Sequence, residues 1–216
     1  MKNNNKIFLG EFIASCFLVM VIVGSGIMAE NLTNDNAVRL LANTIATGAG
    51  LFVLITAFAN ISGAHLNPFV SLSMYLTKRI KGKALLTYIP AQIFGCILGV
   101  MLANIFFEHS VLELSSKSRD GFHIFLAEIV ATFGLIFIIF ATLKDGKTTV
   151  AACVATYISA GYWFTSSTSF ANPAVAIART FTDSFTGINY LNTPTYIIAE
   201  LLGTIVAVFI IKRLLK

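Results

Sequence analysis

The sequence predicts an all-α membrane protein with six transmembrane helices and two re-entrant half-helices arranged as an inverted repeat. Three observations predict this fold class: an apolar composition, six long apolar stretches, and two Asn-Pro dipeptides at matching places in the two halves. Of the 216 residues, 56% are hydrophobic and 12% are charged, and the mean hydropathy is +0.82. So few charges cannot cover a soluble domain, which places the chain in a lipid bilayer.

Six apolar stretches approach the length of about 20 residues that a helix needs to cross hydrocarbon. They are residues 7–28, 37–59, 84–107, 122–143, 149–166 and 195–211. The first is too long for a signal peptide and lacks an obvious cleavage site. The fifth is the least regular, because residues 162–169 are polar and aromatic. Tyr162 and Trp163 there are expected to anchor the membrane interface or to flank a pore mouth.

The three cysteines, Cys16, Cys96 and Cys153, all fall inside these stretches, without the paired spacing of a zinc or redox site. We expect them to be packing residues. Neither a metal site nor a cofactor is predicted.

The positive charges are distributed unevenly between the connections. With a cytoplasmic N-terminus, eleven of the 15 basic residues fall inside: Lys2, Lys6, Lys78, Arg79, Lys81, Lys83, Lys144, Lys147, Lys212, Arg213 and Lys216. Arg39, Lys117, Arg119 and Arg179 fall outside. This positive-inside asymmetry predicts that both termini are cytoplasmic, and it explains the basic composition without a nucleic-acid partner.

The two halves of the sequence align at three landmarks. Residues 10–15 (GEFIAS) match residues 127–132 (AEIVAT), residues 66–70 (LNPFV) match 171–175 (ANPAV), and residues 91–95 (AQIFG) match 199–203 (AELLG). Because each half crosses the membrane three times, the second half starts on the opposite side. We therefore expect one membrane domain over residues 1–216, built from inverted repeats at 7–107 and 122–211, with a permeation site near the midplane.

The Asn-Pro pairs, Asn67-Pro68 and Asn172-Pro173, each follow a polar, glycine-containing loop and precede a short apolar run. Asn is a favoured N-cap, and Pro suits the first helical position because its missing N–H would have no partner there. Two half-helices that start at these motifs and continue through the apolar runs 70–76 and 175–181 would thus enter from opposite faces and meet near the bilayer centre. Irregular backbone at that depth must be packed in protein or line water, which predicts a pore.

Through residues 62–68 (SGAHLNP), residues 171–174 (ANPA) and the repeated Glu11 and Glu128, the whole chain resembles the aquaporin family. The resemblance implies a tetramer of independent pores. It also implies that the amides of Asn67 and Asn172 donate to the permeant, while the carbonyls of three residues accept from it. Those three residues are Gly63, Ala64 and His65.

Both half-helices would point their positive ends at the midplane and repel cations and protons, so neutral solutes pass more easily. Glu11 and Glu128 lie at span depth, where an ionised carboxylate is costly. We expect them to accept hydrogen bonds from the re-entrant loops, with a proton relay as the alternative. His65 is expected to be a hydrogen-bonded scaffold group.

The resemblance also locates a four-residue selectivity filter, at fixed spacings from the two Asn residues. These positions hold Thr47, Ala160, Ser169 and Val175. Water-selective relatives carry Phe, His and Arg at the first, second and fourth positions, and glycerol channels keep the Arg. With Thr, Ala and Val there instead, the pore is expected to be wider and less polar.

Arg179 lies one helical turn beyond Val175. It is expected either to place a displaced positive charge at the outer mouth or to pair with Asp183 or another loop acid. A filter without arginine, followed by this Arg, resembles the bacterial aquaglyceroporins associated with arsenic resistance. Glycerol-like polyols, arsenite and methylated arsenicals are the solutes that this resemblance implies, with water as a further candidate.

One position departs from the family pattern. Phe69 stands third in the first motif, where the family usually has Ala, as the second copy has Ala174. The ring is expected either to fill space beside the pore or to narrow the midplane.

Three classes of function remain open. A passive channel in a bacterial inner membrane is the main prediction, with an ordinary water-permeable aquaporin or a secondary transporter as alternatives. An enzyme would need a nucleophile and a base. Ser62 and His65 are near each other in sequence, but the capped half-helices explain both without catalysis, so no catalytic residue is predicted.

Overall fold

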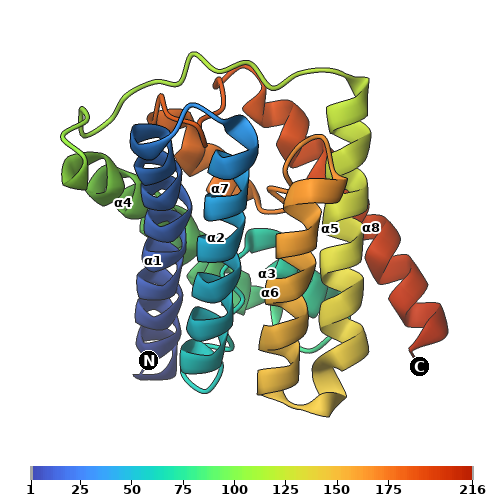
Figure 1. The fold of residues 1–216 in the computed structure, drawn as a ribbon. Helices are drawn as coiled ribbons and strands as arrows, with labels where there is room; N and C mark the ends of the chain where they lie inside the picture. The colour runs from blue at the N-terminus through green and yellow to red at the C-terminus, as the bar shows by residue number, and fades with distance from the viewer. Residues whose placement is uncertain (1, 216) are drawn as a thin grey trace.

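The computed structural model of the protein describes residues 2–215 and is all-helical in its regular structure over that range. Six long helices surround two short ones (Figure 1). The long helices are α1 (Lys2–Leu32), α2 (Asn36–Phe58), α4 (Gly82–Phe106), α5 (Phe122–Thr142), α6 (Lys147–Phe164) and α8 (Thr193–Leu214). The short helices are α3 (Pro68–Leu76) and α7 (Pro173–Ala178), with 3-10 turns η1 (Leu143–Asp145) and η2 (Arg179–Phe181).

Five of the long helices are long and apolar enough to cross a membrane. The exception is α6, whose 18 residues would span about 27 Å at the usual helical rise. Its Thr156 and Ser159 hydroxyls lower its apolarity, but each donates to a carbonyl one turn back in the same helix. In Figure 1, α6 runs beside α5 between the same two ends of the bundle, and it packs against both α2 and α5.

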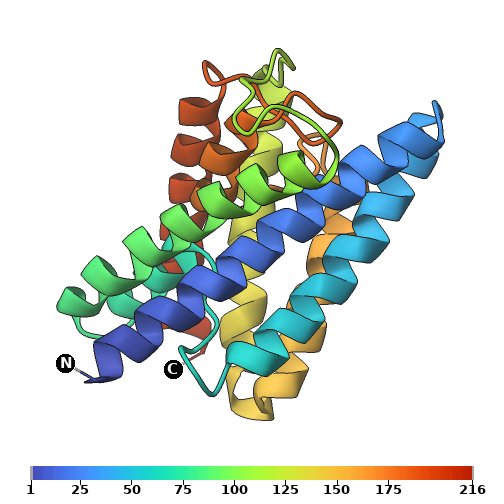
Figure 2. The same cartoon turned by 90° about the vertical axis from the view of Figure 1, so that its left-hand side faces the viewer.

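The packing repeats between the two halves of the chain. Helix α1 packs mainly against α4, and α5 mainly against α8; Figure 2 shows α1 and α4 lying alongside each other. Glycines permit both close approaches, because a Cβ at Gly95 would meet the Phe12 carbonyl and one at Gly203 would meet the Ile129 carbonyl. The element order α1–α4 recurs as α5–α8.

Both chain termini lie at one end of the bundle, with the α5–α6 turn (Figure 1). Nine of the eleven expected cytoplasmic cations belong to segments at this end: Lys6, Lys78, Arg79, Lys81, Lys83, Lys144, Lys147, Lys212 and Arg213. Lys216 lies outside the described residues, and the side chain of Lys2 is not described either. The sequence expectation that these cations share one side therefore agrees with the chain path.

Candidate functional site

The two half-helices begin as their Asn-Pro motifs predict. Asn67 caps α3 by accepting hydrogen bonds from the backbone N–H groups of Phe69 and Val70. Asn172 caps α7 in the same way, through Ala174 and Val175. Pro68 and Pro173 each occupy the first helical position. The short helices therefore start two residues before the apolar runs at 70–76 and 175–181, and α7 continues as the turn η2 through Phe181.

The two caps also bind each other's loops. The Asn67 side-chain amide donates to the Ala171 carbonyl at 2.7 Å, and the Asn172 amide donates to the Leu66 carbonyl at 2.8 Å. Each amide has two N–H groups. The second N–H group of each amide has no hydrogen-bond partner among the described residues. It is therefore able to donate to a molecule inside the cavity.

Buried glutamates hold the two loops that precede the caps. Glu11 accepts from the backbone N–H groups of His65 and Leu66, at 3.0 and 2.7 Å. Glu128 accepts from the corresponding groups of Phe170 and Ala171, at 2.9 and 2.8 Å. Both glutamates are 0% exposed. These contacts supply partners for the loop amides at a depth where water cannot.

The loop backbone is strained at matched positions in the two halves. Ala64 and Leu66 have φ values of 50° and 54°, and Ser169 and Ala171 have values of 51° and 47°. Non-glycine residues avoid this left-handed region, and such strain persists only where the surroundings impose it. Alternating left-handed residues turn the peptide planes, and Gly63, Ala64 and His65 line the cavity that the caps adjoin.

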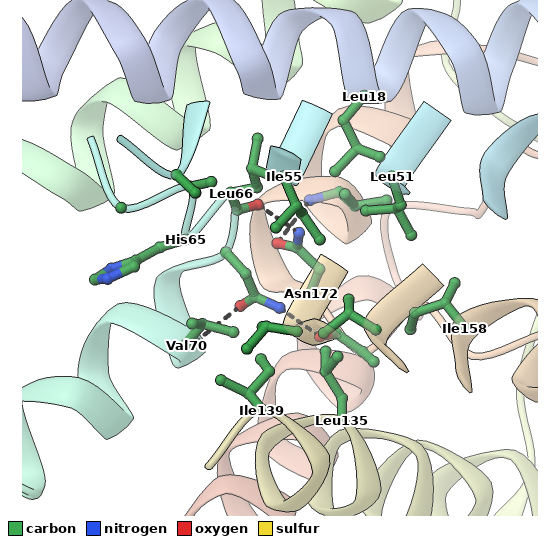
Figure 3. A pocket seen from close by; sticks show the side chains of 18 of the residues that line it. Leu18, Leu51, Ile55, His65, Leu66, Val70, Leu135, Ile139, Ile158 and Asn172 are labelled. Atoms are coloured by element: carbon green, nitrogen blue, oxygen red, sulfur yellow. Dashed lines mark hydrogen bonds between the residues drawn. The ribbon is translucent and has the colours of Figure 1, made fainter. Parts of the chain in front are cut away.

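That cavity has a volume of about 450 Å³ and is lined by residues from both ends of the bundle. Arg79 and Lys147 line it at the end that holds the chain termini, and Thr47, Tyr162 and Arg179 line it at the other. Figure 3 shows Asn172 in the middle, among aliphatic side chains of α1, α2, α5 and α6, and Asn67 lines the same cavity. The labelled aliphatic residues are Leu18, Leu51, Ile55, Leu66, Val70, Leu135, Ile139 and Ile158.

The expected filter positions are only partly where the spacing placed them. Thr47, Ser169 and Val175 line the cavity. Ala160 does not; it is exposed on another face of α6, while Ile158 and Tyr162 of the same helix face the cavity. The spacing of twelve residues before Asn172 was therefore wrong here. Tyr162 takes the position instead, with its hydroxyl 3.1 Å from the Thr47 hydroxyl.

Arg179 lines the outer part of the cavity and is 3% exposed. Its Cζ lies 3.5 Å from the centroid of the Phe170 ring, which also lines the cavity. Its Nε donates to the Thr186 carbonyl. Within the described residues it forms no ion pair, so the expected alternative of a salt bridge to Asp183 is wrong.

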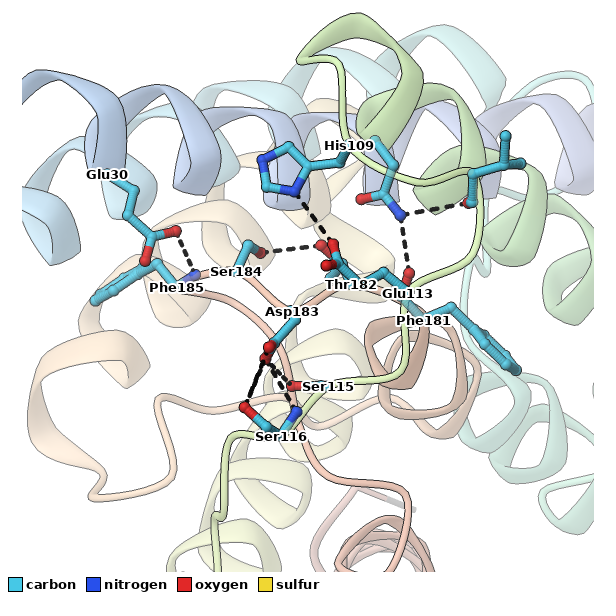
Figure 4. Close-up of polar contacts among 12 residues, drawn as sticks. Glu30, His109, Glu113, Ser115, Ser116, Phe181, Thr182, Asp183, Ser184 and Phe185 are labelled. Carbon is cyan, nitrogen blue, oxygen red and sulfur yellow. Dashed lines mark hydrogen bonds and ion pairs between the residues drawn. The ribbon is translucent and has the colours of Figure 1, made fainter.

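The outer loops explain why Asp183 is not available. Its carboxylate accepts hydrogen bonds from the Ser116 backbone N–H at 2.9 Å and from the Ser116 hydroxyl (Figure 4). Glu30 accepts from the Phe185 N–H at 2.7 Å. The acids of this face thus bind loop groups, and Arg179 is left with carbonyl and aromatic neighbours.

The contacts of His65 and Phe69 indicate structural roles for both side chains. The His65 Nδ1 lies 3.0 Å from the Ser71 hydroxyl, and its ring stacks on Tyr88 with centroids 4.3 Å apart. Phe69 packs against the hydrophobic core and is not among the residues lining the cavity. The ring therefore fills space beside the cavity and does not narrow it.

Glu200 lies at the second cap, although no role was predicted for it from the sequence. Glu200 accepts from the Asn172 backbone N–H at 2.9 Å, and its second carboxyl oxygen has no partner among the described residues. Its counterpart in the first half is Gln92, which donates to Glu11 at 2.8 Å. The alignment of residues 91–95 with 199–203 contained this signal, since it pairs an amide with a carboxyl.

The chain resembles known membrane channels over its whole length. Residues 1–163 match the model of the major intrinsic protein family. Aquaglyceroporin AqpS of Rhizobium meliloti (strain 1021) is 47% identical over 208 residues, which cover 96% of this chain and 89% of that protein. Probable aquaporin TIP2-2 of Oryza sativa subsp. japonica is 29% identical over 205 residues, covering 92% of this chain and 82% of that protein.

Among solved structures, the X-ray structure of the aquaglyceroporin from Plasmodium falciparum superposes with a TM-score of 0.78. It covers 98% of this chain and 97% of its own, at 21% sequence identity, and so supports the fold. The chain therefore belongs to the major intrinsic protein family and is a membrane channel of the aquaporin fold, not an enzyme.

Proposed function

We propose that the chain is a passive channel for small uncharged solutes: glycerol-like polyols and metalloid hydroxides such as arsenite, with methylated arsenicals also within its range. The observation that carries this proposal is the cavity in which the amides of Asn67 and Asn172 meet among aliphatic walls. A solute with hydroxyl groups on one side and an apolar surface on the other matches both kinds of wall.

The Asn67 and Asn172 amides act as the donors for the passing hydroxyls, and the carbonyls of Gly63, Ala64 and His65 act as acceptors. Glu11 and Glu128 keep the two loops in place for this role. The N-terminal ends of α3 and α7 face the same point, so their dipoles oppose the passage of cations and protons. Passage is therefore selective for neutral species.

The outer constriction is formed by Thr47, Tyr162, Ser169 and Val175, with Arg179 as a displaced cation. The polyol class is supported by the similarity to aquaglyceroporin AqpS. The metalloid class rests on Val175 in place of the usual arginine, followed by Arg179, a pattern that resembles the aquaglyceroporins associated with arsenic resistance. Trihydroxides such as arsenite resemble glycerol in carrying three hydroxyls around a compact centre. They would use the same donors and acceptors.

A water-permeable aquaporin is the second candidate, and a specific observation favours it. Tyr162 lines the outer part of the cavity, where the sequence spacing had placed Ala160, and Arg179 lines it one turn beyond Val175. A ring and a guanidinium there make the mouth narrower and more polar than expected. Water would then pass more easily than glycerol.

A coupled transporter has less support. It would need an ionisable group that can take up a coupled ion on the permeation path. Of the described residues, no Asp or Glu lines the cavity, and Glu11 and Glu128 accept hydrogen bonds from backbone amides.

The test is stopped-flow light scattering on proteoliposomes, with water, glycerol and arsenite as separate permeants and protein-free vesicles as the baseline. A passive channel gives glycerol or arsenite flux that does not saturate and needs no ion gradient. Val175→Arg should reduce that flux at least tenfold, because a second guanidinium would fill the mouth beside Arg179. Val150→Ile, at the other end of the cavity, is the matched control.

Fast water flux without glycerol or arsenite flux would select the second candidate. Unchanged glycerol flux in Val175→Arg would show that the constriction lies elsewhere.

The proposed oligomeric state, membrane and orientation are based on the family and on the distribution of charged residues. We propose a homotetramer in a bacterial inner membrane, with both termini in the cytoplasm and inverted repeats over residues 7–107 and 122–211. Chemical crosslinking in native membranes tests the tetramer, and accessibility of cysteines introduced at the termini tests the orientation.

A further inference from the structure

A second hollow, of about 480 Å³, lies away from the pore, where α3 and α8 end. Four cations line it: Lys78 and Arg79, which follow α3, and Lys212 and Arg213, in the last turn of α8. The other lining residues are mostly apolar, and they are Leu76, Thr77, Phe140, Phe209, Ile211 and Leu215. The hollow therefore combines concentrated positive charge with an apolar wall.

These four charges have no acidic partner in the part of the chain that the structure describes. The ion pair found there joins His109 and Glu113, in the connection between α4 and α5. Arg79 and Arg213 instead lie over aromatic rings, with Cζ 5.4 Å from the Phe140 centroid and 3.8 Å from the Phe209 centroid. Stacking on a ring holds a guanidinium in place while its N–H groups stay free to donate.

Lys212 and Arg213 also complement the C-terminal dipole of α8. That interaction does not explain Lys78 and Arg79, which follow a different helix and converge on the same hollow. Four uncompensated cations repel one another, so an anion between them would stabilise the arrangement. A phosphate group is the anion whose oxygens match several guanidinium and ammonium donors at once.

An exposed apolar stripe leads from this hollow along α8. Ile198, Leu202, Ile205 and Phe209 follow one another at spacings of four, three and four residues, which places them on one face of the helix. Their exposures are 54%, 41%, 50% and 50%. The stripe covers about 17 Å of helix, a length suited to part of an acyl chain, and Phe209 joins it to the cationic hollow.

We propose that this hollow binds the phosphate headgroup of an anionic phospholipid, whose acyl chain lies along the α8 stripe. Basic pockets of this kind at helix ends are suited to anionic headgroups. A free phosphate shares the headgroup chemistry but would leave the apolar stripe unused. The assignment of this lipid to the cytoplasmic leaflet rests on the proposed orientation of the channel. The binding of the lipid does not depend on that orientation.

Arg79 gives the site a connection to the pore. It lines both this hollow and the main cavity. A bound headgroup would therefore neutralise a cation at the pore mouth on the side of the chain termini. The lipid composition of that leaflet would set the charge that a solute meets there.

The experiment uses the purified full chain in a neutral detergent and measures binding by native mass spectrometry and by the shift in thermal midpoint. Phosphatidylglycerol is compared with phosphatidylcholine and with glycerol phosphate, which has the anionic group but no acyl chain. We expect phosphatidylglycerol to bind at least tenfold more tightly than either. The double variant Lys212→Gln/Arg213→Gln should lose roughly 30-fold in that affinity, at about fivefold for each charge removed.

The matched control is Lys81→Gln/Lys83→Gln, which removes two exposed cations at the same end of the bundle that do not line the hollow. It should keep wild-type affinity. Equal binding of phosphatidylcholine, equal effects of the two double variants, or full binding of glycerol phosphate would each overturn the proposal. None of these readouts measures transport. The lipid-binding result would therefore stand even if the flux measurements contradicted the proposed function.

Discussion

The Arg179 guanidinium lies over the Phe170 ring, with Cζ 3.5 Å from the ring centroid, and both residues line the outer part of the cavity. Replacing Arg179 by Leu removes this charge while keeping an apolar contact with the ring. We expect glycerol flux to increase by about threefold to tenfold relative to water flux, because the mouth becomes wider and loses its strongest donor. Stopped-flow shrinkage of proteoliposomes measures both fluxes.

Arg213→Leu is the control for that variant, since Arg213 also stacks on a ring, that of Phe209, but does not line the cavity. Its flux ratio should match the wild type. A ratio that stays constant in Arg179→Leu would mean that the side chain only supports the loop at Thr186, to whose carbonyl it donates.

The second prediction concerns Glu200, which accepts from the Asn172 N–H and lies near Glu128. Two neighbouring carboxyl groups cannot both be ionised cheaply, whereas the first half pairs Glu11 with the amide of Gln92. Glu200→Gln should therefore fold, and its free energy of unfolding should increase by about 1 kcal/mol, because the new amide can donate to Glu128. In a protein of this size such a gain raises the thermal midpoint by about 2–4 °C.

The reciprocal change, Gln92→Glu, should lower the midpoint by a similar amount, because it places a second carboxyl beside Glu11. If Glu200→Gln is destabilised as strongly as Gln92→Glu, an amide cannot replace the Glu200 carboxyl at this position.

The contrast between these pairs also shows what the sequence could predict. The Asn caps, the first-position prolines and the repeated Glu11 and Glu128 follow from local rules, since each needs only a short motif at a known helix end. The filter position on α6 depends instead on the length of the loop to Asn172. Ile158 and Tyr162 of α6 line the cavity and Ala160 does not, and no local rule fixes which face of this helix turns inward.

The contacts of Arg179 could not be predicted from the sequence for a related reason. Its neighbours are the Thr186 carbonyl and the Phe170 ring, which are uncharged and follow no recognisable spacing from Arg179. Asp183, four residues later, looked like a partner because helical spacing would bring the two together. The chain leaves the helix at Phe181, so this spacing no longer applies.

The third prediction tests the loop support. Glu128→Leu leaves the backbone N–H groups of Phe170 and Ala171 without acceptors in a buried site, which costs about 1–3 kcal/mol for each. We expect loss of folded protein on detergent extraction or a fall of many degrees in thermal midpoint. Glu128→Gln, which keeps one acceptor oxygen, should be intermediate.

Glu113→Leu serves as the comparison, since it removes an acid from the loop before α5 whose partly exposed ion pair with His109 contributes little to stability. Its midpoint should stay within about 2 °C of the wild type. Wild-type stability in Glu128→Leu would show that the Phe170 and Ala171 amides find other partners.

The fourth prediction concerns Lys117, in the loop between α4 and α5, whose ammonium donates to the Phe185 carbonyl at 2.7 Å. Burial, followed by the charges of Arg119 and Arg179, lowers the pKa of Lys117 to about 8. In an unfolded chain the pKa of a lysine is about 10.4. Between these values the unfolded state holds a proton that the folded state has released, so the free energy of unfolding rises with pH.

Below pH 8 both states are charged, and the folded protein bears the full cost of burying the ammonium. We therefore expect the thermal midpoint of the wild type to rise between pH 8 and pH 10 relative to that of Lys117→Met, in which this titration is absent. Lys83→Met, an exposed lysine at the opposite end, controls for loss of a charge. Parallel midpoint curves for Lys117→Met and the wild type would mean that Lys117 reaches solvent and keeps its proton.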